Sequence, residues 1–258
     1  MADREERLDW AERWIADGLR VLDPPGGFAT LDVDMSRART LLERLRRRGI
    51  PATHNLLVVR AAALTLARRP DLHRMVVGTR RSLPERVDIG LSVAGSTQYA
   101  PIMILADAGH KSLATLADEM RRRLPEVRAK EKKDLTDMRR LGWLIPFGWL
   151  RRLILRALFG QIWFRRKLAG TFQVSCLDRV DLCVPFLFNT AACLGVGRVR
   201  DGVVALNGEA QVRPIVTLAV SIDHKAWDGV RAAAFLGEVA KILNEGLLEA
   251  EVPAEAAA

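Results

Sequence analysis

One continuous stretch near the C-terminus constrains the fold more than any other part of the chain. Residues 215–222 form an uncharged run rich in β-branched side chains, which is typical of a strand inside a well-covered sheet. Asp228 and Gly229 then favour a turn, and apolar side chains recur at helical spacing over residues 230–247. The sequence therefore predicts a strand, a short turn and a helix, with His224 at the end of the strand.

A histidine at such a junction is held firmly and can still reach a cleft. This placement suits a general base, because an imidazole ring gains and loses a proton near neutral pH. Asp228, four residues after His224, can fix the turn by a salt bridge or by accepting hydrogen bonds from backbone N–H groups, which keeps the ring in one orientation. The residues alone leave a second interpretation open, in which His224 is a buried histidine with a structural role.

Several segments of the chain share their pattern with one known family. Residues 223–229 (Asp-His-Lys-Ala-Trp-Asp-Gly), followed by an alanine-rich helix, resemble the active-site signature of the acyltransferase catalytic domains of 2-oxo acid dehydrogenase complexes. Residues 170–175 (Gly-Thr-Phe-Gln-Val-Ser) resemble the strand that carries a serine in that family. Weaker similarities lie in the expected order at residues 87–93, 101–113 and 189–197. The resemblance spans most of the chain, from about residue 31 to residue 244.

The resemblance carries an expected architecture, because this family shares its trimeric fold with chloramphenicol acetyltransferase. It implies an α/β fold in two layers, with a mixed β-sheet flanked by helices and an active site at the subunit interface of a trimer. We expect residues 1–252 to form a single catalytic domain and residues 253–258 to form a disordered tail. A homotrimer, or a multiple of trimers, is the implied assembly.

The resemblance also assigns chemistry to named side chains. It implies that His224 takes a proton from a thiol or hydroxyl that attacks a thioester carbonyl, and that Ser175 donates a hydrogen bond to the resulting oxyanion. Asp228 has a structural role in the same site. Asn189 and Lys225 are the implied contacts for coenzyme A, although Lys225 stands where the complex-type enzymes usually have arginine. Coenzyme A is then a substrate, and we expect no bound metal and no lipoyl group attached to this chain.

Charge and cysteine content narrow the range of partners. The chain carries 40 Lys and Arg against 31 Asp and Glu, a formal charge of +9 that suits the phosphates of coenzyme A, an anionic membrane surface or simply a solvated basic face. A single tyrosine and the lack of a nucleic-acid motif argue against nucleic acid as a partner. The three cysteines lie in apolar stretches without metal-ligand spacing, which predicts a cytoplasmic protein, with peripheral membrane contact as a further option.

A basic, hydrophobic insertion at about residues 135–168 departs from the family. A helix that begins after Ser112 is expected to end in the charged run at residues 128–134, before this insertion. The insertion contains no uncharged run near the roughly 20 residues that a membrane span needs. Three uses remain open: a surface anchor on anionic lipid through Trp143, Trp149 and Trp163, a wall for a hydrophobic acyl chain, or a packed core or subunit contact.

These observations favour a stand-alone acyltransferase that moves an acyl group between a coenzyme A thioester and a small or lipidic thiol, hydroxyl or amine acceptor. We expect no lipoyl domain and no long flexible linker before the catalytic region. One alternative is a dihydrolipoamide acyltransferase that acts on a lipoyl domain supplied by another protein. The other alternative is a non-catalytic trimeric scaffold, or a membrane-associated binding protein. The joint presence of His224, Ser175 and Asp228 favours an enzyme, because a scaffold needs none of the three.

Overall fold

The computed structural model describes residues 9–22, 26–94 and 100–251 of the 258-residue chain. The predicted tail at residues 253–258 lies outside these ranges. The elements follow one another in this order: α1 (Trp10–Leu22), β1 (Gly26–Asp34), α2 (Ser36–Arg47), α3 (His54–Arg68), β2 (Met75–Val77), β3 (Arg80–Ser82), β4 (Ile89–Ser92), β5 (Ile102–Leu105), α4 (Leu113–Leu144), α5 (Gly148–Phe159), α6 (Ile162–Ala169), β6 (Phe172–Cys176), β7 (Ala192–Val196), β8 (Arg200–Leu206), β9 (Glu209–Asp223), α7 (Gly229–Asn244) and the 3-10 turn η1 (Glu249–Glu251).

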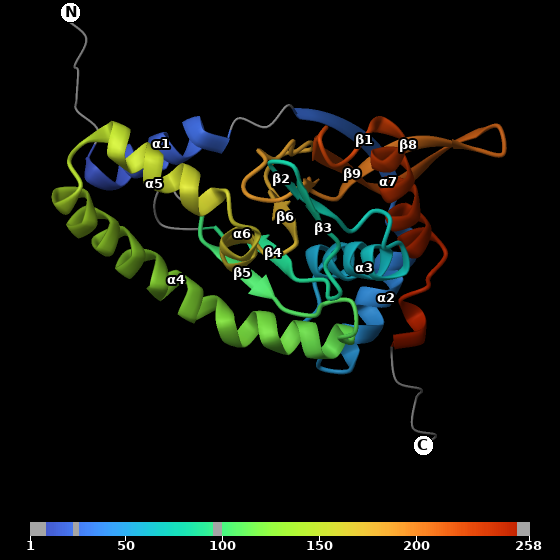
Figure 1. Cartoon of the computed structure of the whole chain (residues 1–258). Coiled ribbons are helices and arrows are strands. Elements are labelled where there is room, and N and C mark those ends of the chain that lie inside the picture. The colour runs from blue at the N-terminus through green and yellow to red at the C-terminus, as the bar shows by residue number, and fades with distance from the viewer. Residues whose placement is uncertain (1–8, 23–25, 95–99, 252–258) are drawn as a thin grey trace, which may run out of the picture.

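The main sheet is mixed, as predicted, and its order is β1-β9-β7-β6-β4-β5 (Figure 1). Strands β4, β6 and β7 run parallel, and the remaining neighbours are antiparallel. The 15-residue strand β9 has two partners in succession. Its first half forms a hairpin with β8, and its second half lies between β1 and β7 in the centre of the sheet.

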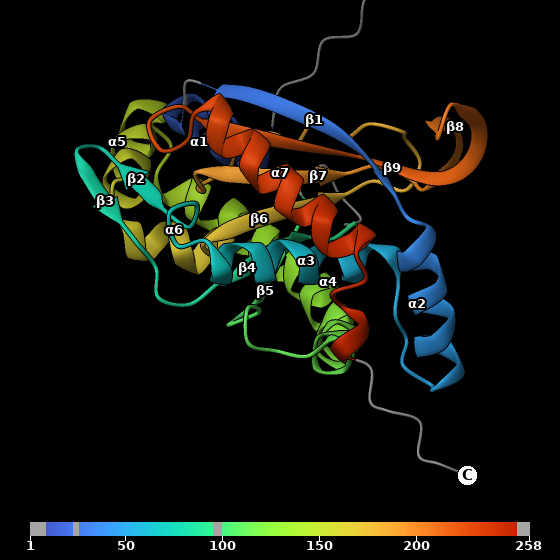
Figure 2. The ribbon, with the colours of Figure 1, turned by 90° about the vertical axis from the view of Figure 1, so that its right-hand side faces the viewer.

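Helices α3 and α7 lie side by side over one face of this sheet (Figure 2). Helix α3 is apolar on most sides and almost entirely buried, because it fills the space between the sheet, α4 and α7. Three aromatic side chains meet where α7 crosses the sheet: Phe172, Trp227 and Phe235 are fully buried, and their ring centroids lie 5.1–6.3 Å apart. This packing fixes the start of α7 and the turn that precedes it.

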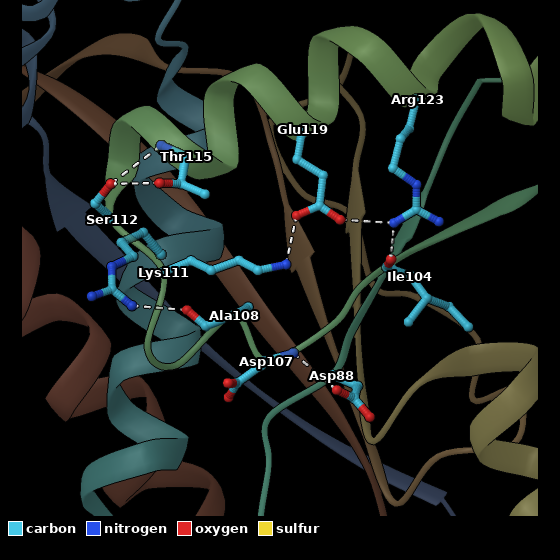
Figure 3. A network of polar contacts seen from close by, with 10 residues as sticks. Asp88, Ile104, Asp107, Ala108, Lys111, Ser112, Thr115, Glu119 and Arg123 are labelled. Carbon is cyan, nitrogen blue, oxygen red and sulfur yellow. Dashed lines mark hydrogen bonds and ion pairs between the residues drawn. The ribbon is translucent and has the colours of Figure 1, made fainter.

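The expected end of the helix at residues 128–134 is wrong. Helix α4 contains Pro125, yet it continues through the charged run and reaches Leu144, because Glu, Lys and Arg are strong helix formers and residues 128–134 contain neither proline nor glycine. The Ser112 hydroxyl caps the helix by accepting a hydrogen bond from Thr115 N at 3.2 Å. Figure 3 shows how its first turns are held: Glu119 pairs with both Lys111 and Arg123, which also donates to Ile104 O on β5.

After α4, the insertion forms two short helices, and α5 packs against α1, which also contacts α4 (Figure 1). Trp14, Leu155 and Phe159 make a small separate cluster between α1 and α5. The Arg151 guanidinium forms a buried ion pair with Asp17 at 3.0 Å. The packed-contact alternative therefore accounts for the inner side of α5.

The outer side of the same helices is apolar and exposed. Its large exposed side chains are Leu141, Trp143, Phe147, Trp149, Leu153 and Trp163. Within the ranges that the structure describes, no helix is long and apolar enough to span a membrane. Contact of this outer side with a membrane surface stays a prediction.

Candidate active site

The strand, turn and helix predicted around His224 are confirmed. Strand β9 ends at Asp223, and the turn closes when Ala226 N and Trp227 N donate to the Asp223 carbonyl at 2.9 and 3.0 Å. Ala226 and Trp227 are buried in the core, whereas the side chains of His224 and Lys225 are exposed. The alternative of a buried structural histidine therefore does not describe His224.

A glycine of the neighbouring strand positions the imidazole ring. Gly26 lies opposite Asp223 in the β1–β9 register, so the next residue, Gly27, lies beside the start of the turn. A Cβ atom added to Gly27 would come within 2.9 Å of His224 Nε2. The ring thus rests against bare backbone, and any larger residue at this position would displace it. The sequence reasoning missed Gly27, for which the Gly26-Gly27 pair at the start of β1 was the available signal.

Asp228 fixes the turn from its far end, as its structural assignment predicted. Its carboxylate caps α7 by accepting a hydrogen bond from Arg231 N at 2.8 Å, and it also pairs with the Arg231 guanidinium. The backbone hydrogen bond, followed by the charge of Arg231, holds the pKa of Asp228 below its usual range. Its carboxylate is therefore a helix cap rather than a proton donor.

Ser175 lies far from His224 within one chain. It is half-buried on β6, opposite Gly195 of β7, which in turn lies opposite Ala219 of β9. His224 follows Ala219 by five residues, which is about 17 Å along a strand, and two strand spacings add about 10 Å sideways. The structure therefore does not bring the two predicted catalytic residues together in one copy.

The surroundings of Ser175 are close-packed. A Cβ atom on the neighbouring Gly195 would lie 1.9 Å from Cys183 O, so residues 183–185 pass directly over this part of the sheet. Burial raises the pKa of the Cys183 thiol, and a hydrogen bond with Ser175 acts in the opposite direction. Burial also raises the pKa of Cys176 to about 12, which keeps this neighbouring thiol protonated.

Asn189 and Lys225 do come together, beside the His224 turn. They line a cavity of about 40 Å³ with Thr190, Asp223 and Arg165, among others. Asn189 has a positive φ of 68° and is 3% exposed, and neither polar atom of its amide has a hydrogen-bond partner among the described residues. The sequence reasoning missed Asp223, although its place directly before His224 was visible.

A second, larger cavity lies at the opposite end of the sheet, beside the strand end that carries Ser175. It measures about 510 Å³ and is lined by α2, the start of α3, the loop after β7 and Asp178, three residues after Ser175. Its basic residues are Arg39, Arg46, His54, Arg198 and Arg200, and its acidic residues are Glu43, Asp178 and Asp201. We call it the basic cavity. Burial, together with the charges of Arg46 and Arg39, lowers the pKa of His54. The sequence analysis did not identify this site, although Arg39 and Arg46 recur on one face of α2.

His73, by contrast, has a structural role in the core. Its Nε2 atom lies 2.7 Å from Thr171 Oγ1, inside the core. Burial lowers the pKa of His73 to about 4, so the ring is neutral at physiological pH. Among the described residues, no group of acidic, histidine and cysteine side chains could hold a metal ion.

Comparison with known proteins decides the family. A family model described as the 2-oxoacid dehydrogenases acyltransferase (catalytic domain) matches residues 180–248, which include β7, β9 and the His224 turn. The dihydrolipoyllysine-residue acetyltransferase component of the pyruvate dehydrogenase complex of Bacillus subtilis is 33% identical over 198 residues, which cover 76% of this chain and 39% of that protein. This chain belongs to the acyltransferase catalytic-domain family.

Solved structures agree with this family in fold. The Azotobacter vinelandii dihydrolipoamide acetyltransferase matches with a TM-score of 0.72 and 19% identity, over 96% of this chain and 94% of that one. Chloramphenicol acetyltransferase matches with a TM-score of 0.52 and 15% identity, over 94% of this chain and 100% of that one. The predicted α/β fold is therefore confirmed for this acyltransferase domain. The chain spans 54% of one curated relative and 39% of another, about half their length or less.

Proposed function

We propose that this chain is a coenzyme A-dependent acyltransferase in which His224 is the general base and Ser175 stabilises the oxyanion. The observation that carries the proposal is the exposed imidazole of His224, held against Gly27 on a turn whose two ends are fixed by Trp227 and Asp228. The related Azotobacter vinelandii structure supports these roles, because it was determined to investigate a serine, a histidine and an asparagine in the catalytic mechanism of that enzyme. That histidine and asparagine are four positions apart, as are His224 and Asp228.

The proposed reaction has two steps. His224 removes the proton from the attacking thiol, hydroxyl or amine, and the nucleophile adds to the thioester carbonyl. The Ser175 hydroxyl donates a hydrogen bond to the oxyanion, after which the carbon–sulfur bond breaks and the leaving thiolate regains the proton from His224. A positioned base contributes about 10²–10⁴-fold, and loss of one oxyanion donor costs about 10²–10³-fold.

We propose that two copies of the chain build each site. Because Ser175 and His224 lie at opposite ends of the sheet in one protomer, the His224 turn of one copy must face the Ser175 strand of its partner. A closed trimer offers three such equivalent contacts. The exposed apolar segment after Ser175 supports this interface, since Leu177, Leu182 and Phe186 are uncovered in the single chain.

The basic cavity supports coenzyme A as the acyl carrier. Its arginines suit the phosphates of the nucleotide end, and its position beside Asp178 leads the pantetheine arm past Ser175. Asn189 and Lys225 lie at the other end of the protomer, so in a two-copy site they would approach the thioester from the His224 side. They therefore remain proposed contacts for the reacting end of coenzyme A rather than for its phosphates.

The names of the curated relatives favour a second acceptor. Several of them are dihydrolipoyllysine-residue acyltransferases of dehydrogenase complexes. Dihydrolipoamide on a lipoyl domain supplied in trans would use the same base and the same oxyanion donor. The exposed aromatic side chains of α5 and α6 favour instead a lipidic acceptor or a long acyl chain.

Thiol release from short-, medium- and long-chain acyl-CoA tests the proposal. Free dihydrolipoamide, a separate lipoyl domain and a lipid extract serve as alternative acceptors. His224→Ala should abolish release, whereas His110→Ala, which changes another exposed histidine, should leave it unchanged. Full activity in His224→Ala would refute the assignment. If coenzyme A also failed to bind, the scaffold alternative would replace the enzyme.

A further inference from the structure

The insertion does more than cover the outside of the fold, because helix α6 reaches the His224 turn. Two hydrogen bonds fix the corner between α5 and α6: Arg165 Nε donates to Phe159 O at 2.6 Å, and Arg80 of β3 donates to Gly160 O at 2.6 Å. On the side of the sheet, Arg166 pairs with Asp88 at 3.3 Å. Helix α6 is therefore held at both ends, and its side chains have defined positions.

One of these side chains faces a buried carboxylate. Asp223 is 7% exposed, and among the described residues its carboxylate accepts one hydrogen bond, from Lys225 N at 3.0 Å. A carboxylate buried to this extent requires a compensating positive charge. Arg165 and Lys225 are the two cations among the described residues that line the cavity next to it. Burial lowers the pKa of Arg165, and the negative charge of Asp223 acts against this effect.

Asp223 also determines where His224 lies. Its backbone N–H donates to Ala191 O at 2.9 Å, and its carbonyl accepts both hydrogen bonds that close the turn. Displacement of Asp223 would therefore move the turn and lift the imidazole from Gly27. The amide of Asn189, which has no hydrogen-bond partner among the described residues, lines the same small cavity as Arg165 and Asp223.

We propose that Arg165 is a positioning residue for His224: from the insertion, it balances the charge of Asp223 across the cavity and so holds the catalytic turn in place. This inference rests on the proposed function for its effect on catalysis, but its structural effect can be measured without any acyl transfer. It assigns to the insertion a role in the site itself, in addition to its packing against α1.

The experiment compares Arg165→Gln with Lys167→Gln, which removes the same charge from an exposed position of the same helix. The first readout is the rate at which diethyl pyrocarbonate modifies His224, measured by mass spectrometry relative to the exposed His110. We expect Arg165→Gln to raise this ratio severalfold, since the ring leaves Gly27, and Lys167→Gln to leave it unchanged. Arg165→Lys should restore the ratio at least in part.

The second readout is turnover of the best thioester. Arg165→Gln should lower kcat by roughly 10- to 100-fold with little change in KM, because misplacement of a catalytic group affects the chemical step. The substitution should have no further effect in an Asp223→Asn background, where the charge that it balances is gone. If Arg165→Gln fails to fold, Asp223→Asn and Arg165→Lys still report on the His224 ratio.

The outcomes separate the two proposals. A normal modification ratio in Arg165→Gln overturns the positioning role, whatever the activity. A raised ratio in a protein that transfers no acyl group supports the positioning role and refutes the proposed function alone.

Discussion

At the scale of single residues, this site depends on the absence of a side chain at position 27. Gly27 lets the imidazole of His224 approach β1, and a methyl group there would come within 2.9 Å of Nε2. The backbone of Gly27 does not have a positive φ, so alanine is compatible with the strand itself. Catalysis and folding therefore place different demands on this position.

We expect Gly27→Ala to lower kcat at least 10-fold without loss of stability, because the added methyl group displaces only the exposed ring. Steady-state kinetics and thermal unfolding measure the two effects. Gly237→Ala is the matched control, since a Cβ atom there meets nothing within 4 Å. It should leave kcat unchanged and stabilise helix α7 by about 0.5–1 kcal/mol. Equal activity in both variants would contradict the placement of the ring.

His73 should make the protein less stable in mild acid. Its pKa is about 4 in the folded protein and 6.5 without burial, so the unfolded chain binds the proton more readily between these values. The contribution of neutral His73 to the free energy of unfolding is complete above pH 6.5. It is lost as the pH falls toward 4, by an amount of about 3 kcal/mol. Urea unfolding at pH 7 and pH 4.5 measures this loss. His73→Gln should reduce it, whereas the exposed His110→Gln should not; equal pH dependence in both would contradict the assignment.

At the scale of elements, the insertion shows what a pattern along the chain can and cannot predict. The central strand, the turn and α7 were predictable, because an uncharged alternating run, an Asp-Gly pair and helical spacing are all local signals. The length of α4 was not, since the sequence contains a charged run that is equally typical of exposed loops. The partner of Arg151 was also hidden, because Asp17 lies in a helix more than a hundred residues away. Charge on one helix gives no information about which distant element neutralises it.

The Asp17–Arg151 pair provides a test of how α1 is held. Asp17→Asn should weaken the packing of α1 on α5 by about 3–5 kcal/mol, because it leaves the Arg151 guanidinium buried without a counter-charge. Hydrogen exchange of the α1 amides reports this local loss. Combined Asp17→Leu and Arg151→Met should restore much of the protection. If α1 exchanged equally in the single variant and the native chain, the ion pair would not anchor the helix.

At the scale of the whole molecule, the two predicted catalytic residues belong to different ends of one sheet. The sequence could name both residues from its resemblance to a family, but the distance between them follows only from strand register. The basic cavity was likewise invisible, because it is assembled from α2, α3 and the loop after β7. Only the fold shows that this cavity neighbours Ser175 and not His224.

Complementation tests the two-copy site. Ser175→Ala and His224→Ala chains, each inactive alone, should regain activity when co-expressed, because some interfaces then join an intact serine to an intact histidine. Random assembly of equal amounts into trimers predicts about a quarter of the native activity. The same chains mixed without subunit exchange serve as the control. No recovery in verified mixed oligomers would show that each site lies within one chain.

The uninterrupted strand β9 joins the two ends of the sheet and keeps them apart in every folded copy. In the proposed two-copy arrangement, a single protomer would therefore be inactive, because each end of its sheet carries only half of a site. Acyl-CoA would be safe from wasteful hydrolysis or misdirected transfer until assembly is complete, and specific activity would fall on dilution even though each chain stays folded. In this arrangement, acyl transfer begins only when subunits associate, because the length of one strand keeps the two halves of the site apart within each chain.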